Sequence, residues 1–200
     1  ITGTATKTPT ATATSTFSID RTILINEVAW AGTSSTRTGD EWIELYNRST
    51  GAISLDGWEL RIQAGGTISV LATFTTGDSI PVGGFFLLAR SNDCNLTDYE
   101  NVFQNVDEDK CFSTTLTNNP SGQALLLYDN NDNVRDTANL DQGNWPAGSS
   151  TTYSSMERKG NVSDNTTGWF TYAGTPVAGD AVNRDGLFVK GTPKKEIGRA

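Results

Sequence analysis

The sequence contains no histidine, only one methionine and only two cysteines among its 200 residues. Without histidine the chain cannot form a Ser-His-Asp or Cys-His nucleophile, and it cannot hold zinc through imidazole. Two cysteines on their own also make a poor zinc site. The GxSxG, P-loop and GxGxxG patterns are absent as well. The catalytic chemistry that remains open is that of carboxylates.

Charged residues are also sparse, at 19% of the chain, and the net charge is −8. An acidic chain repels a phosphate backbone unless basic residues cluster, and the pair Lys194-Lys195 is the first such run. Nucleic acid is therefore a poor candidate partner, and an anionic membrane surface is disfavoured for the same reason.

Long apolar runs are missing too. No stretch approaches the roughly 20 residues of a membrane-spanning helix, so we expect no transmembrane segment. No signal peptide is visible, but the chain begins without methionine, which suggests a processed product or an excised fragment. The sequence does not indicate an oligomeric state.

The two cysteines, Cys94 and Cys111, lie at either end of one polar segment. In an oxidising compartment a disulfide between them would close that loop and stabilise the fold by roughly 3 kcal/mol. The alternative is two free thiols, or a pair held too far apart to bond. We favour the disulfide.

Threonine, serine, asparagine and glycine are abundant, and they suit strands and turns better than helices. Residues 1–17 form a Thr/Ala/Pro-rich segment that cannot build a core, and we predict a disordered tether there. We predict one folded domain over residues 18–197, with a polar insertion at about 91–112.

Short apolar alternations separated by turn residues predict an all-β sandwich. The clearest strand places Trp58, Leu60 and Ile62 on one face, with polar residues between them. The other predicted strands cover residues 23–31, 41–47, 67–74, 85–90, 152–159 and 169–172, and a hairpin joins 123–129 to 134–138.

Eight short motifs then occur in a recognisable order. They are ILINEVAWAG (23–32), DEWIELYN (40–47), ISLDGWEL (53–60), IPVGGFFLLAR (80–90), ALLLYDNNDNVRDTA (124–138), WPAG (145–148), SMERK (155–159) and GTPK (191–194). In this order they resemble the bacterial lamin-tail domain family, across nearly all of the chain after the Thr-rich segment.

The resemblance implies an immunoglobulin-like β-sandwich related to the globular tail of nuclear lamins. It also implies an exported bacterial setting, secreted or on the cell surface, in which such domains accompany secreted hydrolases or nucleases or stand on tethers. The family has no recognised catalytic motif, so the resemblance supplies no active residues. The insertion at about 91–112 departs from the shorter family pattern and is where an individual function could have been added.

The function predicted from these features is a non-catalytic extracellular binding or anchoring module. It would position an exported protein or attach it to the cell envelope, through an unidentified protein or an envelope glycan. The alternative is a carbohydrate-binding module, with or without calcium, attached to a secreted hydrolase. A third hypothesis, a carboxylate-dependent hydrolase, would need two acids facing one cleft.

The acids best placed for such a hydrolase surround one predicted strand: Asp40, Glu41 and Glu44. Alternation puts Glu41 and Glu44 on opposite faces, with Glu44 beside Trp42 and Tyr46. A structural hydrogen bond or ion pair is therefore the better interpretation of Glu44.

No cofactor is predicted, but calcium is open as an alternative. Its candidate ligands are Asp129, Asn131, Asp132 and Asn133, because calcium prefers oxygen ligands. The spacing does not fit an EF-hand, because the sixth position is Val134 rather than glycine. The favoured interpretation is a hairpin turn, since Asn and Asp tolerate left-handed backbone.

Trp145 and Trp169 are the tryptophans nearest to predicted loops, beside Pro146 and Gly168. An exposed indole face could stack on a sugar ring, which makes both residues candidate ligand-stacking positions. Packing at the edge of the core is the favoured alternative for both.

Overall fold

The computed structural model describes residues 19–91, 94, 101–117 and 122–197. The predicted tether, residues 1–17, and part of the predicted insertion lie outside these ranges. Within them, all regular structure is β, in twelve strands. No helix in this part of the chain is long and apolar enough to cross a membrane. The all-β prediction is confirmed.

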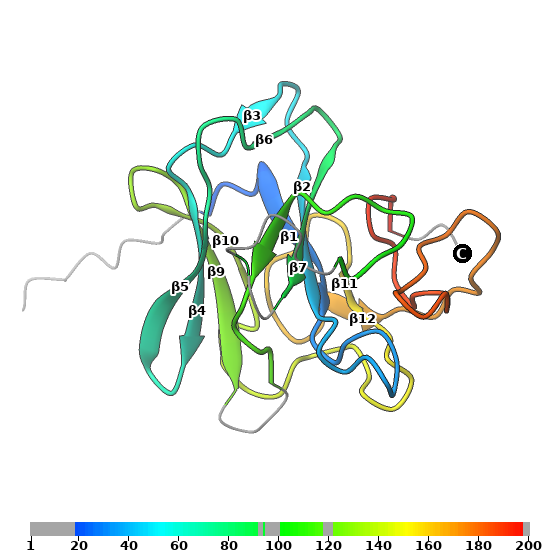
Figure 1. Ribbon diagram of the computed structural model, residues 1–200. Helices are drawn as coiled ribbons and strands as arrows, with labels where there is room; N and C mark the ends of the chain where they lie inside the picture. The colour runs from blue at the N-terminus through cyan, green and yellow to red at the C-terminus, as the bar shows by residue number, and fades with distance from the viewer. Residues whose placement is uncertain (1–18, 92–93, 95–100, 118–121, 198–200) are drawn as a thin grey trace, which may run out of the picture.

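The strands form two main sheets and a small third one (Figure 1). The six-stranded sheet has the order β12 (Trp169–Thr171), β11 (Met156–Arg158), β1 (Ile23–Ala29), β2 (Trp42–Asn47), β7 (Phe85–Arg90) and β8 (Lys110–Phe112). The four-stranded sheet has the order β10 (Val134–Ala138), β9 (Gln123–Tyr128), β4 (Glu59–Ala64) and β5 (Thr67–Thr73). The third pairs β3 (Ile53–Ser54) with β6 (Ser79–Ile80). Neighbouring strands in these sheets are antiparallel except β7 and β8, which run parallel.

The main core lies between the two large sheets, which stand side by side in Figure 1. Leu60 and Ile62 of β4 point into it, as does the preceding Trp58. Ile43 and Leu45 of β2 reach it from the opposite sheet. These positions confirm the alternation predicted for both strands, because successive side chains of a strand point to opposite faces.

A second, smaller core lies on the outer face of the six-stranded sheet. Trp42 projects there from β2, and the Phe103 ring packs against it edge to face, with 5.9 Å between centroids. Ala181 and Val189 complete this cover, and both belong to the C-terminal segment, which we define as the residues that follow β12. The outer face that an isolated sandwich would expose to water is thus buried by the insertion and the C-terminal segment.

The two sheets are also tied together by a buried ion pair at the edge of the main core. Arg158 of β11 bonds Asp136 of β10 at 2.7 Å, and both side chains are almost fully buried. Arg158 also donates to the carbonyls of Ile25 and Thr137. The carboxylate of Asp136 in turn accepts the Ile25 amide at 2.8 Å. One arginine therefore connects β11, β1 and β10.

The late strand is shorter than predicted. The structure has β11 at Met156–Arg158, whereas the prediction covered residues 152–159. Residues 151–153 form a turn in which Tyr153 has φ of 58°, and Ser154 bridges back to Ser149. A left-handed residue turns the chain away from the sheet, so the pairing with β1 begins only after it.

Candidate functional site

Three glutamates stand side by side on the outer face of the six-stranded sheet. Glu27 of β1 is the direct partner of Glu157 on β11 and of Glu44 on β2. A bulge in β1 between Ile25 and Glu27 adds one residue, Asn26, and the Asn26 amide donates to Glu44 at 2.9 Å. All three carboxyl groups are buried. We call Glu157, Glu27 and Glu44 the carboxylate row.

The C-terminal residues 191–194 seal the carboxylate row from solvent. The amide of Thr192 donates to Glu27 at 2.9 Å, and the amide of Lys194 donates to Glu44 at 2.5 Å. The segment lies so close that a Cβ on Gly191 would come within 2.6 Å of Glu27 Oε1 and 2.7 Å of the Trp42 ring. A glycine at position 191 therefore permits the approach.

Burial raises the pKa values of all three carboxyls in the row. Desolvation, followed by the charges of Glu157 and Glu44, raises the pKa of Glu27 well above its usual value. Desolvation also raises the pKa of Glu44 to about 8 and that of Glu157 to about 6. The geometry agrees, because Thr192 Oγ1 lies 2.8 Å from Glu27 Oε2 and 3.0 Å from Glu157 Oε1. A proton on either carboxyl would let that acid donate to the hydroxyl while the hydroxyl donates to the other carboxyl.

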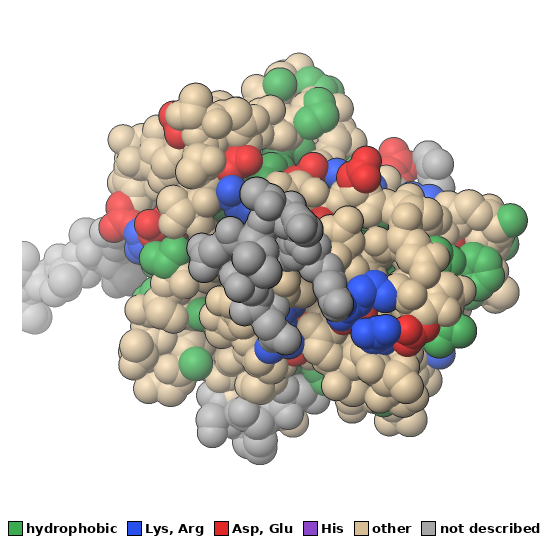
Figure 2. Space-filling model, in the orientation of Figure 1, with side chains coloured by type: hydrophobic (Ala, Val, Ile, Leu, Met, Phe, Trp, Pro, Cys, Tyr) green, Lys and Arg blue, Asp and Glu red, His purple; other side chains and the backbone are tan. Residues whose placement is uncertain are grey.

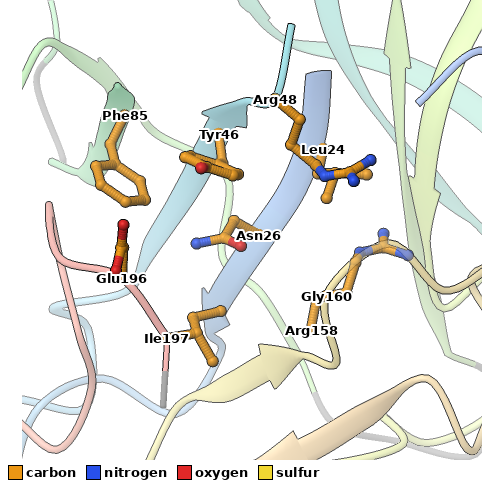
Figure 3. Close-up of a pocket in the computed structure, with 9 residues that line it drawn as sticks. All are labelled: Leu24, Asn26, Tyr46, Arg48, Phe85, Arg158, Gly160, Glu196 and Ile197. Atoms are coloured by element: carbon orange, nitrogen blue, oxygen red, sulfur yellow. The ribbon is translucent and has the colours of Figure 1, made fainter. Parts of the chain in front are cut away.

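A pocket of about 230 Å³ opens on the outer face beside the carboxylate row (Figure 3). Figure 3 shows Asn26 near its middle, with the other side chains around it. We call it the outer-face pocket, and it is lined by Leu24, Asn26, Tyr46, Arg48, Phe85, Arg158, Gly160, Glu196 and Ile197.

The lining combines aromatic, amide and charged groups. Tyr46 and Phe85 are cross-strand partners on β2 and β7, and their rings stack with 4.9 Å between centroids. The side-chain nitrogen of Asn26 donates to Glu44, and the side-chain oxygen of Asn26 accepts no hydrogen bond from any described residue. Arg48 is exposed, and no described residue bonds its guanidinium. The pocket therefore offers an acceptor at its floor and a donor at its rim.

The motifs met along the sequence converge on this place. Glu27 belongs to ILINEVAWAG, Glu44 and Tyr46 to DEWIELYN, Glu157 to SMERK and Thr192 to GTPK. The sequence matches the Lamin Tail Domain family over residues 18–142. The chain belongs to the Lamin Tail Domain family. A comparison with curated proteins finds no match.

The family match and the two packed sheets agree on an immunoglobulin-like β-sandwich. The described fold continues beyond residue 142, where the family match ends. Strands β11 and β12 extend the same sheet, and residues 191–194 cover its outer face. The last third of the chain therefore completes the structure that the matched residues begin.

The predicted disulfide of the lamin-tail domain is present. Cys94 and Cys111 are bonded, with their Cα atoms 5.6 Å apart, within the usual range. Cys111 lies in β8, so the bond fastens one end of the insertion to the six-stranded sheet. The described part of the insertion covers the outer face of the sheet through Val102 and Phe103.

The calcium candidates form a hairpin turn between β9 and β10. Asp129 accepts the amides of Asn131 and Asn133, both at 2.9 Å, and Asp132 has φ of 62°. Arg135 adds an ion pair at 3.5 Å to the same Asp129 carboxylate. Desolvation alone would raise the pKa of Asp129, but the hydrogen bonds from Asn133 and Asn131, together with Arg135, outweigh it and lower that pKa. Its oxygens thus already serve the turn, and calcium stays an untested alternative here.

The two candidate stacking tryptophans are in the main core. Trp145 is 5% exposed and its Nε1 donates to the Thr117 carbonyl at 3.1 Å. Trp169 is 3% exposed and donates to Asp164 at 3.0 Å. Neither ring has a face open to a ligand, and both sit where the packing interpretation places them.

The acids considered for hydrolysis do not meet in an open cleft. Glu41 is buried, accepts the Leu116 amide at 2.9 Å and pairs with Arg90 at 3.5 Å. Asp40 pairs with Arg184. Glu44 lies on the outer face under the C-terminal segment. Each of these three carboxylates already forms a hydrogen bond or an ion pair with another group of the chain.

Sequence reasoning missed the outer-face pocket, although one signal was present. The alternation of DEWIELYN placed Tyr46 and Glu44 together on a face away from the main core. What it could not supply was the bulge at Asn26 or the aromatic partner Phe85, since both depend on strand register.

Proposed function

We propose that this lamin-tail domain is a non-catalytic extracellular binding module that positions an exported protein or attaches it to the cell envelope. The observation that carries the proposal is the outer-face pocket. It offers aromatic surface, an amide and a guanidinium to solvent. The three carboxyls next to it are sealed under residues 191–194 instead of facing the opening. Such a site suits recognition better than acid–base chemistry.

The disulfide supports a location outside the reducing cytosol. Bonds such as Cys94–Cys111 form and persist in oxidising compartments and are rare where thiols are kept reduced. An envelope or secreted setting meets that condition.

The distribution of charge argues against nucleic acid as the partner. On the face shown in Figure 2, Lys and Arg side chains lie in small separate groups next to acidic ones. The net charge of the chain is −8. A nucleic acid backbone needs a continuous basic surface, so a protein or a glycan fits this domain better.

A carbohydrate-binding role is the second candidate, and the Tyr46–Phe85 pair favours it. Both rings are half-buried and line the outer-face pocket. An aromatic wall beside polar groups is the lining that a sugar ring uses, because its C–H face is apolar and its hydroxyls both donate and accept.

The proposed function is tested by sedimenting the whole chain with purified bacterial cell envelopes and with insoluble envelope polysaccharide. Saturable co-sedimentation is expected, with no release of soluble sugar or peptide from the same material. An acidic β-sandwich protein of similar size serves as the control for non-specific retention. Absence of saturable binding to every envelope fraction would contradict the anchoring function, and product release would contradict its non-catalytic character.

A further inference from the structure

We propose that the outer-face pocket is a subsite for one neutral pyranose ring of a glycan. This inference rests on the proposed binding function and names the chemistry of the ligand. Three features of the described residues carry it: the size of the pocket, the complementary polar groups within it, and the charges around it.

The size of the pocket selects a single ring. Its volume is about 230 Å³. Sites for drug-sized ligands measure roughly 300–1,000 Å³, so an extended oligosaccharide or a folded peptide segment exceeds it. The lining comes from β1, β2, β7, β11, the turn at Gly160 and the C-terminal Glu196 and Ile197. In Figure 3 the side chains from these elements lie around Asn26.

The polar groups require a ligand that both donates and accepts hydrogen bonds. Asn26 is nine-tenths buried, and its carbonyl oxygen has no donor among the described residues. A ligand hydroxyl can donate to it. The exposed Arg48 guanidinium, with no partner in the same part of the chain, can donate to ligand acceptors, and neighbouring hydroxyl oxygens can supply two. Vicinal hydroxyls on a ring provide both kinds of group within a short span.

The aromatic wall matches the apolar face of such a ring. Tyr46 and Phe85 stack on each other at an interplanar angle of 27°, so each ring covers one face of the other and leaves its outer face and its edges for other contacts. Their half-buried positions leave part of these faces and edges to the pocket. The C–H face of a pyranose can pack there while its hydroxyls reach Asn26 and Arg48.

The surrounding charge selects a neutral sugar over an acidic one. Glu196 lies on the wall of the pocket, across from Arg48 in Figure 3. The chain as a whole carries −8. A ligand carboxylate would gain Arg48. Glu196 already has an interaction of its own in the chain, so the cost to that carboxylate comes from the net negative field, which a neutral hydroxyl-bearing ring does not meet.

The test uses the whole ¹⁵N-labelled chain and titration followed by NMR. The probes are the methyl glycosides of glucose, galactose, mannose and N-acetylglucosamine, with glucuronic acid as the acidic counterpart. At least one neutral glycoside is expected to shift the side-chain amide of Asn26 and the amides of Tyr46 and Phe85, with a Kd on the order of 1 mM. Arg48→Ala is expected to weaken this binding about tenfold, because it removes a charged hydrogen-bond donor.

Arg61→Ala is the matched control, because Arg61 is a partly exposed arginine on the other sheet, over the Tyr128 ring. It is expected to leave the Kd within about twofold. The inference is overturned if no neutral glycoside shifts the pocket residues, if Arg48→Ala and Arg61→Ala behave alike, or if glucuronic acid binds more tightly than every neutral ring. Envelope sedimentation without sugar binding would remove this inference and leave the proposed function. Sugar binding without sedimentation would contradict the proposed function and leave this inference.

Discussion

At the scale of single residues, the most consequential side chain is Arg158. It is a charged group with no solvent exposure, and it is satisfied by Asp136 and by the carbonyls of Ile25 and Thr137. Desolvation dominates its environment and lowers the pKa of its guanidinium, while the charge of Asp136 acts in the opposite direction. Such a group stabilises the fold only while all its partners are in place.

Arg158→Met is therefore expected to lower the free energy of unfolding by about 3–5 kcal/mol, because it leaves the buried Asp136 with only the more distant Arg21, at 3.8 Å, as an ion-pair partner. Urea-induced unfolding measures the loss. The double variant Arg158→Met with Asp136→Asn should lose less than the two single variants added together, because the unpaired charge is gone. Arg61→Met, which breaks partly exposed pairs with Glu59 and Asp132, should cost no more than about 1 kcal/mol. Equal losses at the two arginines would refute this account of Arg158.

Gly191→Ala tests the close contact between the C-terminal segment and the carboxylate row. The added methyl would meet Glu27 Oε1 at 2.6 Å and the Trp42 ring at 2.7 Å, so we expect a loss of about 1–3 kcal/mol. Gly51→Ala is the matched control, since a Cβ there meets nothing within 4 Å. Thermal unfolding of both variants gives the comparison. A Gly191→Ala protein as stable as Gly51→Ala would show that the segment is not packed as described.

Residues such as Trp58, Leu60 and Ile62 could be assigned to the core from the sequence because alternation is a local property. Asn26 could not be assigned in this way, because a bulge is a relation between two strands and leaves no mark in one. For Trp145 the sequence favoured packing at the core edge, but it could not supply the hydrogen-bond partner of the indole, because the Thr117 carbonyl is distant in the sequence. The sequence pattern predicted which side chains share one face of a strand, but it did not predict which face other parts of the chain would cover.

At the scale of elements, β11, β1 and β2 bring three carboxyls together, and this makes stability depend on pH. The pKa of Glu44 is raised from 4.5 to about 8 and that of Glu157 to about 6, in both cases chiefly by desolvation. The folded state therefore holds more protons than the unfolded state between about pH 4.5 and 8. The stabilisation is fully present below pH 4.5 and is lost as the pH rises through the folded pKa values.

We expect the free energy of unfolding to fall by more than about 1 kcal/mol between pH 5 and pH 8. Denaturant unfolding across this range measures it. Glu44→Gln should reduce the dependence, because glutamine has no proton to lose, while Glu41 and Glu108, with pKa values raised to about 8 and about 7, keep the rest of it. Both Glu44 oxygens accept hydrogen bonds, from Asn26 and Lys194, and the glutamine amide nitrogen cannot accept, so we expect this variant to be less stable than the wild type at low pH. Glu59→Gln, which alters a partly exposed carboxylate on the other sheet, should keep the wild-type slope. A wild-type stability that rises over this range would reverse the sign and contradict the account.

The disulfide belongs to the same scale, because it joins the insertion to β8. Its partners are 17 residues apart, and a loop of that size corresponds to roughly 3 kcal/mol in the loop-entropy estimate. Cys94→Ser with Cys111→Ser is expected to lose stability of that order in chemical denaturation. Treatment of the wild type with reductant should reproduce the loss, and it should not change the double variant. A reductant effect on the double variant would point to another cause.

At the scale of the whole molecule, the sandwich core and its outer cover come from different parts of the chain. The class of fold and the positions of most strands along the chain could be predicted from residues 23–138, where strand patterns follow one another closely. The role of residues 181–194 could not be predicted, because these residues belong to none of the twelve strands and act through contacts with residues far away in the sequence. Thr192 reaches Glu27 across 165 positions, and Lys194 reaches Glu44 across 150. Such contacts depend on the folded whole and leave no local periodicity.

This division predicts that the part of the chain matching the family does not fold alone. A protein of residues 19–142 keeps β1 to β10 but loses β11, β12 and the C-terminal cover. Asp136 then stays buried without Arg158, and the Trp42 face and the carboxyls of Glu27 and Glu44 open to water. Each of these costs falls on a fold of marginal stability. We expect poor dispersion in its amide NMR spectrum and no cooperative thermal transition, whereas residues 19–197 should give both. A cooperative transition from residues 19–142 near that of the longer protein would mean that the outer cover is an addition to the domain and not part of its fold.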